Sequence, residues 1–295
     1  MDLSARSNII VPLMAGFIAG ALVTTAVSRT HAVKTCRPEP TRADMKLLMA
    51  GSSAETYRLQ NFVIKAVRPD EEALLTHEHV KAVRNEANIY HILGRHPRIA
   101  ECLYISPTKG SIVLKYYTHG NLKDHIARQS DVTSTELKKW ARQMIEGVAE
   151  IHRNGIRHAD IRLDQWLLDE EYNARLCDFD ASGHDANENL GLEGTKAMGL
   201  ENPSHFMPRD PMEDSTVLSD LFALGSTLYE LDTGKEPFAD MFDEEHEEEI
   251  TALFEAGNYP EVSALSFGAL ILGCWKGEYE TALDLLRAGE KSCGL

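Results

Sequence analysis

The sequence predicts an α+β fold with two subdomains, because strand patterns dominate one part of the chain and helical patterns dominate the rest. Short runs rich in β-branched and aromatic residues predict strands at 57–59, 62–67, 102–105 and 111–116. Apolar residues at helical spacing predict helices at 71–93, after a capping box at Thr133 and Glu136, and at 217–231. Periodicity alone specifies no more than this class.

The composition is that of an acidic globular chain. It has 295 residues, of which 43% are hydrophobic and 26% charged, so a large core can form. The formal net charge of -16 repels nucleic acid over most of the surface, and we expect no nucleic-acid partner. The five cysteines include no CxxC pair, which indicates neither a zinc site nor a disulfide framework. The acidic run at 240–249 is predicted to be a solvated helix face.

An uncharged segment near the N-terminus predicts a membrane anchor. Residues 8–27 carry no charged side chain, and a helix needs about 20 apolar residues to cross a bilayer. A cleaved signal peptide is the alternative, although the run is long and only Arg6, set against Asp2, precedes it. Basic residues lie mostly after the run, which predicts a cytosolic C-terminal side. We therefore expect a single-pass membrane protein with a transmembrane helix at 8–27, a proline-containing linker at 28–46 and a cytosolic domain.

A block in the middle of the chain carries residues suited to phosphoryl transfer. That reaction needs carboxylates that hold Mg²⁺, a carboxylate that orients the attacking hydroxyl, and a cation on the phosphates of ATP. A resemblance to the catalytic and magnesium-binding loops of protein kinases lies in the segment from His158, HADIRLDQWLLDEEYNARLCDFDASG. The resemblance implies that Asp160 accepts the proton of the substrate hydroxyl, and that Asp178 and Gln165 bind Mg²⁺.

The same resemblance assigns nucleotide-binding residues upstream. The kinase strand that carries the phosphate-binding lysine is similar to FVIKAV, in which that lysine is Lys65. Glu86 lies on the inward face of the next predicted helix, and the resemblance implies that it pairs with Lys65. Gly51, Lys115 and Tyr116 complete the predicted nucleotide site. The implied cofactors are ATP and Mg²⁺.

The resemblance extends over residues 47–290 in the order of the family. It implies a bilobal protein-kinase-like fold, with a β-rich N-lobe at 47–117 and a helical C-lobe at 118–295, preceded by the transmembrane helix. Asp220 matches the buried aspartate that supports the catalytic loop in kinases. The tripeptide DIR in the catalytic loop resembles a divergent group of fungal kinase-like proteins.

Several positions depart from the kinase pattern. Gly51 is the one glycine that remains of the phosphate-covering loop, and Asp180 replaces the glycine of the magnesium-binding motif. Gln165 is one methylene longer than the family's asparagine. Arg162 replaces the catalytic-loop lysine and keeps a positive charge near the transferred phosphoryl, so we count it among the catalytic residues. Ala159 replaces an arginine that binds a phosphate on the activation segment of many kinases, so we expect phosphorylation of that segment to leave activity unchanged.

Three functions fit this pattern. The first is a serine/threonine protein kinase that transfers the γ-phosphoryl of ATP to a protein hydroxyl. The second is a pseudokinase acting as a membrane-tethered binding or scaffold module, which the lost glycines favour. The third is a small-molecule phosphotransferase, against which the protein-kinase-like segment from Ser219 argues, SDLFALGSTLYELDTGKEPF. The sequence does not specify the protein substrate or scaffold partner.

Overall fold

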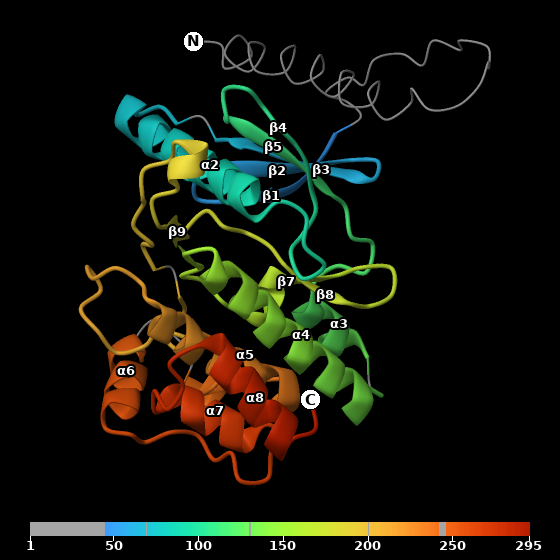
Figure 1. Cartoon of the computed structure of the whole chain (residues 1–295), viewed down its shortest axis with the longest axis vertical. Helices are drawn as coiled ribbons and strands as arrows, with labels where there is room; N and C mark the ends of the chain where they lie inside the picture. The colour runs from blue at the N-terminus through green and yellow to red at the C-terminus, as the bar shows by residue number, and fades with distance from the viewer. Residues whose placement is uncertain (1–44, 69, 130, 200, 242–245) are drawn as a thin grey trace, which may run out of the picture. The chain divides into compact units, whose positions relative to one another are not determined.

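A computed structural model describes residues 45–295, except 69, 130, 200 and 242–245 (Figure 1). The chain divides into two compact units. The first contains the chain up to Val83 together with Cys102–Tyr116, and the second contains Arg84–Glu101 and Tyr117–Leu295. Residues 84–101 therefore group with the helical unit, although they lie between two segments of the first unit in the sequence.

The expected membrane localisation is corrected by the structure. In the described part of the chain, no helix is both long enough and apolar enough to cross a membrane. The two longest helices have 21 and 20 residues, but both carry charged side chains along their length. The span predicted at 8–27 and the linker up to residue 44 lie outside the described residues. A single-pass membrane protein is therefore not supported.

The first unit is an antiparallel sheet of five strands in the order β1-β2-β3-β5-β4 (Figure 1). The strands are β1 (Lys46–Ala50), β2 (Ala54–Leu59), β3 (Phe62–Val67), β4 (Cys102–Ile105) and β5 (Ser111–Lys115). Leu59 and Ile64 form a buried cluster, against which Met45 and Val113 pack. The four predicted strands are confirmed, and β2 is longer at its N-terminal end than the prediction of 57–59.

Strand β1 is absent from the sequence analysis, which assigns residue 46 to a linker. All five side chains of β1 are exposed, so its residues KLLMA show no alternation of buried and exposed positions. Period-two alternation is the signal by which a half-buried strand is recognised. A strand without a buried face leaves no such signal, and its pairing with β2 alone defines it.

Helix α2 (Ala73–Leu93) contains the boundary between the two units. Its buried side chains include Glu86, Ile89 and Leu93 of the predicted apolar face. The helix ends at Gly94, whose φ of 59° is a left-handed conformation that glycine adopts at little cost. The prediction of a helix at 71–93 is therefore confirmed to within its first turn.

The second unit is mainly helical. Its helices are α3 (Leu122–Arg128), α4 (Ser134–Arg153), α5 (Val217–Thr233), α6 (Glu247–Glu255), α7 (Gly268–Trp275) and α8 (Ala282–Ser292). Helices α4, α5, α7 and α8 pack against one another (Figure 1). Trp140 and Met144 of α4 are fully buried, as are most residues of α5. The β-sheet unit and the helical unit confirm the α+β class.

Two short antiparallel pairs of strands position the candidate site of the second unit. Strands β7 (Trp166–Leu168) and β8 (Ala174–Leu176) pair with each other in the segment between Asp160 and Asp178. Strands β6 (Ile156–Arg157) and β9 (Gly183–His184) join the segment before Asp160 to the segment after Asp178. These pairings bring distant parts of the sequence together around the two aspartates.

The capping box at the start of α4 gives a first test of stability. Oγ1 of Thr133 accepts the N–H of Glu136 at 3.2 Å, and Oε2 of Glu136 accepts the N–H of Thr133 at 2.9 Å. We expect Thr133→Ala to lower the free energy of unfolding by about 1 kcal/mol, measured by urea denaturation. Ser134→Ala, in the first turn but without a capping role, should change it by less than about 0.5 kcal/mol. Equal losses in the two variants would contradict the assignment.

Candidate active site

Asp220 in the first turn of α5 fixes the backbone of the loop that carries Asp160. Its carboxylate accepts the backbone N–H groups of His158 at 2.8 Å and Ala159 at 2.9 Å. Nε2 of His152 lies 2.8 Å from the same carboxylate. Burial alone would raise the pKa of Asp220, but the interactions with His152 and the backbone of Ala159 outweigh it and lower the pKa. The prediction of a buried anchor at Asp220 is confirmed.

Two non-glycine residues of this region have left-handed backbones. Ala159 has a φ of 64° and Asp178 a φ of 67°, which costs roughly 1–2 kcal/mol for an L-residue. Ala159 is fully buried, and its hydrogen bond to Asp220 holds it in this conformation. Asp180 is not among the described residues with a positive φ, so it replaces glycine here without such strain. Strain at two positions next to the predicted catalytic groups indicates a functional constraint on the backbone.

Asp160 is buried, and both oxygens of its carboxylate are engaged. Oδ1 accepts Nε of Arg162 at 2.7 Å, while Oδ2 accepts Nη2 of Arg162 at 2.9 Å and Nε2 of Gln165 at 2.8 Å. Burial raises the pKa of Asp160, and the guanidinium of Arg162 opposes this shift. A raised pKa makes the carboxylate a better proton acceptor. Three donors occupy a carboxylate that can accept about four, so an acceptor position on Oδ1 is left for a substrate hydroxyl.

Gln165 and Asp178 offer oxygen atoms suited to Mg²⁺. The amide nitrogen of Gln165 is used on Asp160, so its amide oxygen is the atom left to bind a metal. The charge of Asp178 contributes to raising the pKa of Asp160, which indicates that the two carboxylates are near each other. The described residues include no group of three or more His, Cys, Asp or Glu that could hold a metal alone. Mg²⁺ is usually bound by one or two carboxylates plus substrate phosphates, so this donor set fits Mg²⁺ that arrives with ATP.

Glu86 of α2 connects this helix to the segment after Asp178. It is fully buried, and its Oε1 accepts the N–H of Phe179 in a long hydrogen bond of 3.4 Å. The ring of Phe179 lies edge-on to Tyr90, with centroids 5.3 Å apart. The predicted partner of Glu86 is Lys65, which belongs to the other unit, and that pairing stays a prediction.

Lys65 and Gly51 lie in the sheet unit. Lys65 is buried in β3, with 6% of its surface exposed. Gly51 is in the turn between β1 and β2, where its N–H donates to the carbonyl of Ala54 at 2.8 Å. Its carbonyl accepts Nη1 of Arg68 at 2.9 Å. Both backbone groups of Gly51 are thus engaged within the unit, and its contact with nucleotide stays a prediction.

Lys115 and Tyr116 stand at the end of β5. Lys115 lies opposite Phe62 of β3. The guanidinium of Arg58 lies 3.9 Å from the ring centroid of Tyr116, a cation–π contact, and the N–H of Tyr116 donates to Asn61. The predicted site residues therefore fall into two groups. Arg162 and Gln165 contact Asp160 directly, whereas the residues predicted to bind nucleotide belong to the sheet unit, namely Gly51, Lys65, Lys115 and Tyr116. Their roles toward nucleotide stay predictions.

The segment after Asp178 is held in place by an ion pair and by side-chain hydrogen bonds. Nη1 of Arg157 lies 2.5 Å from Oδ1 of Asp185, next to the β6–β9 pair. Asn85 of α2 donates to the carbonyl of Ser182 and accepts Oγ1 of Thr195 at 2.9 Å. The sequence analysis missed Arg157 and Asn85, because nothing in the kinase-like motifs marks either position. The cationic side chain of Arg157 therefore faces this segment, and it is already paired with the carboxylate of Asp185.

A second polar cluster lies near the catalytic loop. Nζ of Lys123 is 3.0 Å from Oε1 of Glu230 and 2.5 Å from Oε1 of Glu236. Ser204 donates to Glu236 at 3.1 Å, so its oxygen accepts Nδ1 of His205 at 3.0 Å. This places the proton of neutral His205 on Nδ1. Complete burial lowers the pKa of His205 to about 3.

Comparison with known proteins agrees with this geometry. The family model for the protein kinase domain matches residues 49–283. CBL-interacting serine/threonine-protein kinase 8 of Arabidopsis thaliana is 27% identical over 205 residues, 68% of this chain and 43% of that protein. CBL-interacting protein kinase 24 of Oryza sativa subsp. japonica is 30% identical over 173 residues, 57% of this chain and 37% of that protein. The human hormonally up-regulated neu tumor-associated kinase is 29% identical over 161 residues, 54% of this chain and 22% of that protein.

The matched regions cover less than half of these relatives. The shares are 43%, 37% and 22% of their own lengths, so the similarity concerns one domain of each. These three relatives are from plants and a vertebrate. The predicted resemblance to fungal kinase-like proteins therefore stays a prediction.

His205 gives a prediction for the dependence of stability on pH. An exposed histidine takes up its proton near pH 6.5, whereas buried His205 does so at about 3. Between these values the unfolded chain binds more protons than the folded chain, so the free energy of unfolding falls as the pH falls. We expect His205→Gln to reduce this slope between about pH 7 and about pH 5, measured by urea denaturation.

A histidine on the surface provides the control for this measurement. His77 is exposed on α2, and His77→Gln should leave the slope of the wild-type protein unchanged. If His205→Gln and wild type lose stability equally on acidification, His205 is not the group that resists protonation.

Proposed function

The chain belongs to the protein kinase family, and from this premise we propose that it transfers the γ-phosphoryl of ATP to a serine or threonine hydroxyl of a protein. One observation carries the proposal: Asp220 holds the loop backbone, and the loop presents Asp160 beside Arg162 and Gln165. Relatives that carry the serine/threonine kinase name support this choice of acceptor. The substrate protein is unknown.

Each residue of the catalytic loop has a separate role in the proposed phosphoryl transfer. Asp160, whose pKa is raised by burial, orients the attacking hydroxyl and accepts its proton as the bond to phosphorus forms. Arg162 supplies positive charge at the transferred phosphoryl once it leaves one oxygen of Asp160. Asp178 and Gln165 are the residues that would hold Mg²⁺, and the metal ion would neutralise charge on the phosphates.

The sheet unit supplies the nucleotide-binding residues in this proposal. Lys65 binds phosphate, and Glu86 fixes the position of Lys65 by an ion pair. Gly51, Lys115 and Tyr116 contact the nucleotide.

A second candidate is a pseudokinase that binds a partner without transferring phosphate. The observation that favours it is the bidentate ion pair of Arg162 with Asp160, which together with Gln165 takes three of the roughly four acceptor positions of that carboxylate. The engaged backbone groups of Gly51 favour it as well, because they are not directed at phosphate. The two candidates differ in whether phosphate is transferred.

Three substitutions separate these candidates and test the site. Lys65→Met should weaken ATP affinity, measured by titration in the presence and absence of Mg²⁺. Asp160→Asn should leave ATP affinity within about twofold and lower phosphoryl transfer by about 10²–10³, because it acts on the transition state. Asp178→Asn should abolish the effect of Mg²⁺ on ATP binding. Equal loss of binding in the Lys65 and Asp160 variants would show that the site is assigned wrongly, and ATP binding without transfer in the wild type would favour the pseudokinase.

The bidentate ion pair between Arg162 and Asp160 leads to a further prediction. A lysine is a point donor and engages one oxygen at a time, whereas arginine engages both. We expect Arg162→Lys to raise the turnover number by roughly tenfold, because one charge-assisted hydrogen bond that competes with the substrate hydroxyl for Asp160 is removed. Arg162→Gln, which removes the charge, should lower turnover. A slower Arg162→Lys enzyme would show that the pair does not restrain catalysis.

A further inference from the structure

A groove lies between the loop after Glu201 and helix α6, away from the catalytic loop residues. It is a cavity of about 480 Å³. The residues that line it and carry the argument are Pro203, Phe206, Arg209, Glu247, Glu248 and Glu255. They belong to one compact unit, so the groove does not depend on the placement of the sheet unit.

The floor of the groove is apolar and contains a buried arginine. Arg209 pairs with Glu201 at 3.1 Å, and the two side chains are 6% and 1% exposed. The guanidinium also donates to Ser215 at 3.0 Å and lies 4.4 Å from the ring centroid of Phe206. Its Nε–H is buried and has no acceptor in the described part of the chain.

The rim of the groove is acidic. Glu247, Glu248 and Glu255 are exposed, and within the described residues none of the three forms an ion pair. The chain as a whole carries a formal charge of -16, so its field also attracts a cationic partner. An apolar floor with an unpaired acidic rim is complementary to a ligand that carries both apolar and basic groups.

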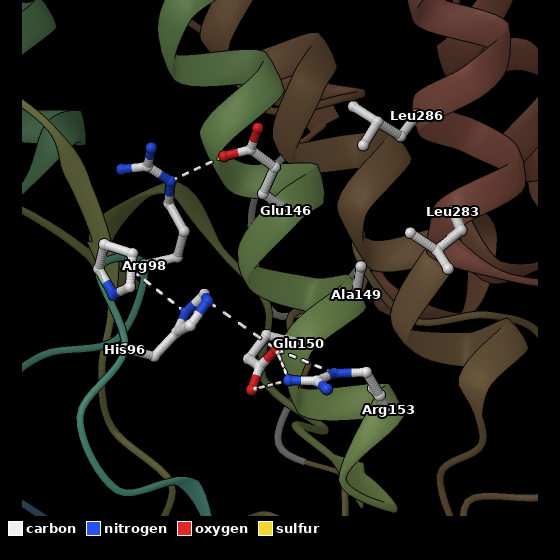
Figure 2. A pocket seen from close by; sticks show the side chains of 9 residues that line it. His96, Arg98, Glu146, Ala149, Glu150, Arg153, Leu283 and Leu286 are labelled. Carbon is white, nitrogen blue, oxygen red and sulfur yellow. Dashed lines mark hydrogen bonds and ion pairs between the residues drawn. The ribbon is translucent and has the colours of Figure 1, made fainter.

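In a second cavity, by contrast, the charged side chains are paired with one another (Figure 2). It measures about 280 Å³ and lies between α4 and α8, with Leu283 and Leu286 on one side. Its charged side chains satisfy one another: Arg98 pairs with Glu146 at 2.8 Å, and Arg153 with Glu150 at 2.7 Å. The charged side chains of that cavity are therefore already paired, in contrast to the rim glutamates of the groove beside α6.

We infer that the groove beside α6 binds a basic segment of another polypeptide. Lysine or arginine side chains would face Glu247, Glu248 and Glu255, and an apolar side chain would rest on Pro203 and Phe206. A polypeptide offers apolar and basic side chains together at this spacing. A metal ion or a polyamine would meet the rim alone.

The inference stands apart from phosphoryl transfer, since binding in this groove needs neither ATP nor Asp160. The probe is a short fluorescent peptide of arginine, leucine and glycine, measured by anisotropy with the full chain and no nucleotide. Glu247→Lys, Glu248→Lys and Glu255→Lys together should weaken binding by about tenfold. The same peptide with glutamate in place of arginine should not bind.

A matched variant separates the groove from the net charge. Glu171→Lys, Glu278→Lys and Glu280→Lys change three exposed carboxylates elsewhere on the same unit and alter the total charge equally. They should change affinity by less than about twofold at about 0.15 M salt, where distant charges are screened. Equal weakening in both triple variants would overturn the inference, because it would show a nonspecific attraction.

A steric variant tests the groove without changing charge. Ala252 lines the groove and is exposed on α6, so Ala252→Trp fills the cavity without disturbing the core. It should weaken the peptide by about tenfold and leave the cooperative unfolding transition unchanged. Wild-type affinity in this variant, or no binding by the wild type, would overturn the inference. Because phosphoryl transfer is assayed separately, loss of either property is distinguished from loss of the other.

Discussion

The carboxylate of Asp220 is the constraint on which the candidate site depends. It is fully buried, where an unpaired carboxylate would cost several kcal/mol, and it accepts two backbone N–H groups and faces His152. These bonds fix the backbone of His158 and Ala159, including the left-handed Ala159. The orientation of Asp160 follows from this backbone. The helix core therefore helps to determine where the predicted catalytic carboxylate stands, together with the bonds that Arg162 and Gln165 make to Asp160 within the loop.

The segment after Asp178 is also held in place by a carboxylate, but the interactions are weaker. Asp185 supplies a carboxylate to Arg157 where a phosphate would otherwise have to supply negative charge, and the pair lies beside the short β6–β9 ladder. The Asp185 side chain is 69% exposed, so this ion pair contributes little to global stability. Its role is better understood as local ordering. Asn85 adds bonds from the α2 side, which connects the segment to the helix that carries Glu86.

Much of this arrangement could be predicted from the sequence, for identifiable reasons. Asp220 was predictable from the resemblance of its segment to the kinase helix whose buried aspartate supports the catalytic loop, although α5 also contains Glu230 and Asp232. The strand pair between Asp160 and Asp178 was predictable from motif spacing. Strand β1, with every side chain exposed, left no periodic signal. The ion pairs of Arg157 and Arg209 depend on how loops fold back, and neither propensity nor spacing encodes such contacts.

The distribution of charge explains how one acidic chain can contain both a catalytic loop and a separate binding groove. Its deeply buried carboxylates are paired with cations, as in Glu201 with Arg209 and Asp169 with Arg175. Pairing consumes the basic residues, which number 30 against 46 acidic ones, so the excess negative charge collects on the surface. Where such surface carboxylates surround an apolar hollow, as on α6, water can leave on binding and each charge acts more strongly. The need to neutralise the core thus leaves an excess of negative charge on the surface, on which the proposed binding of a basic segment depends.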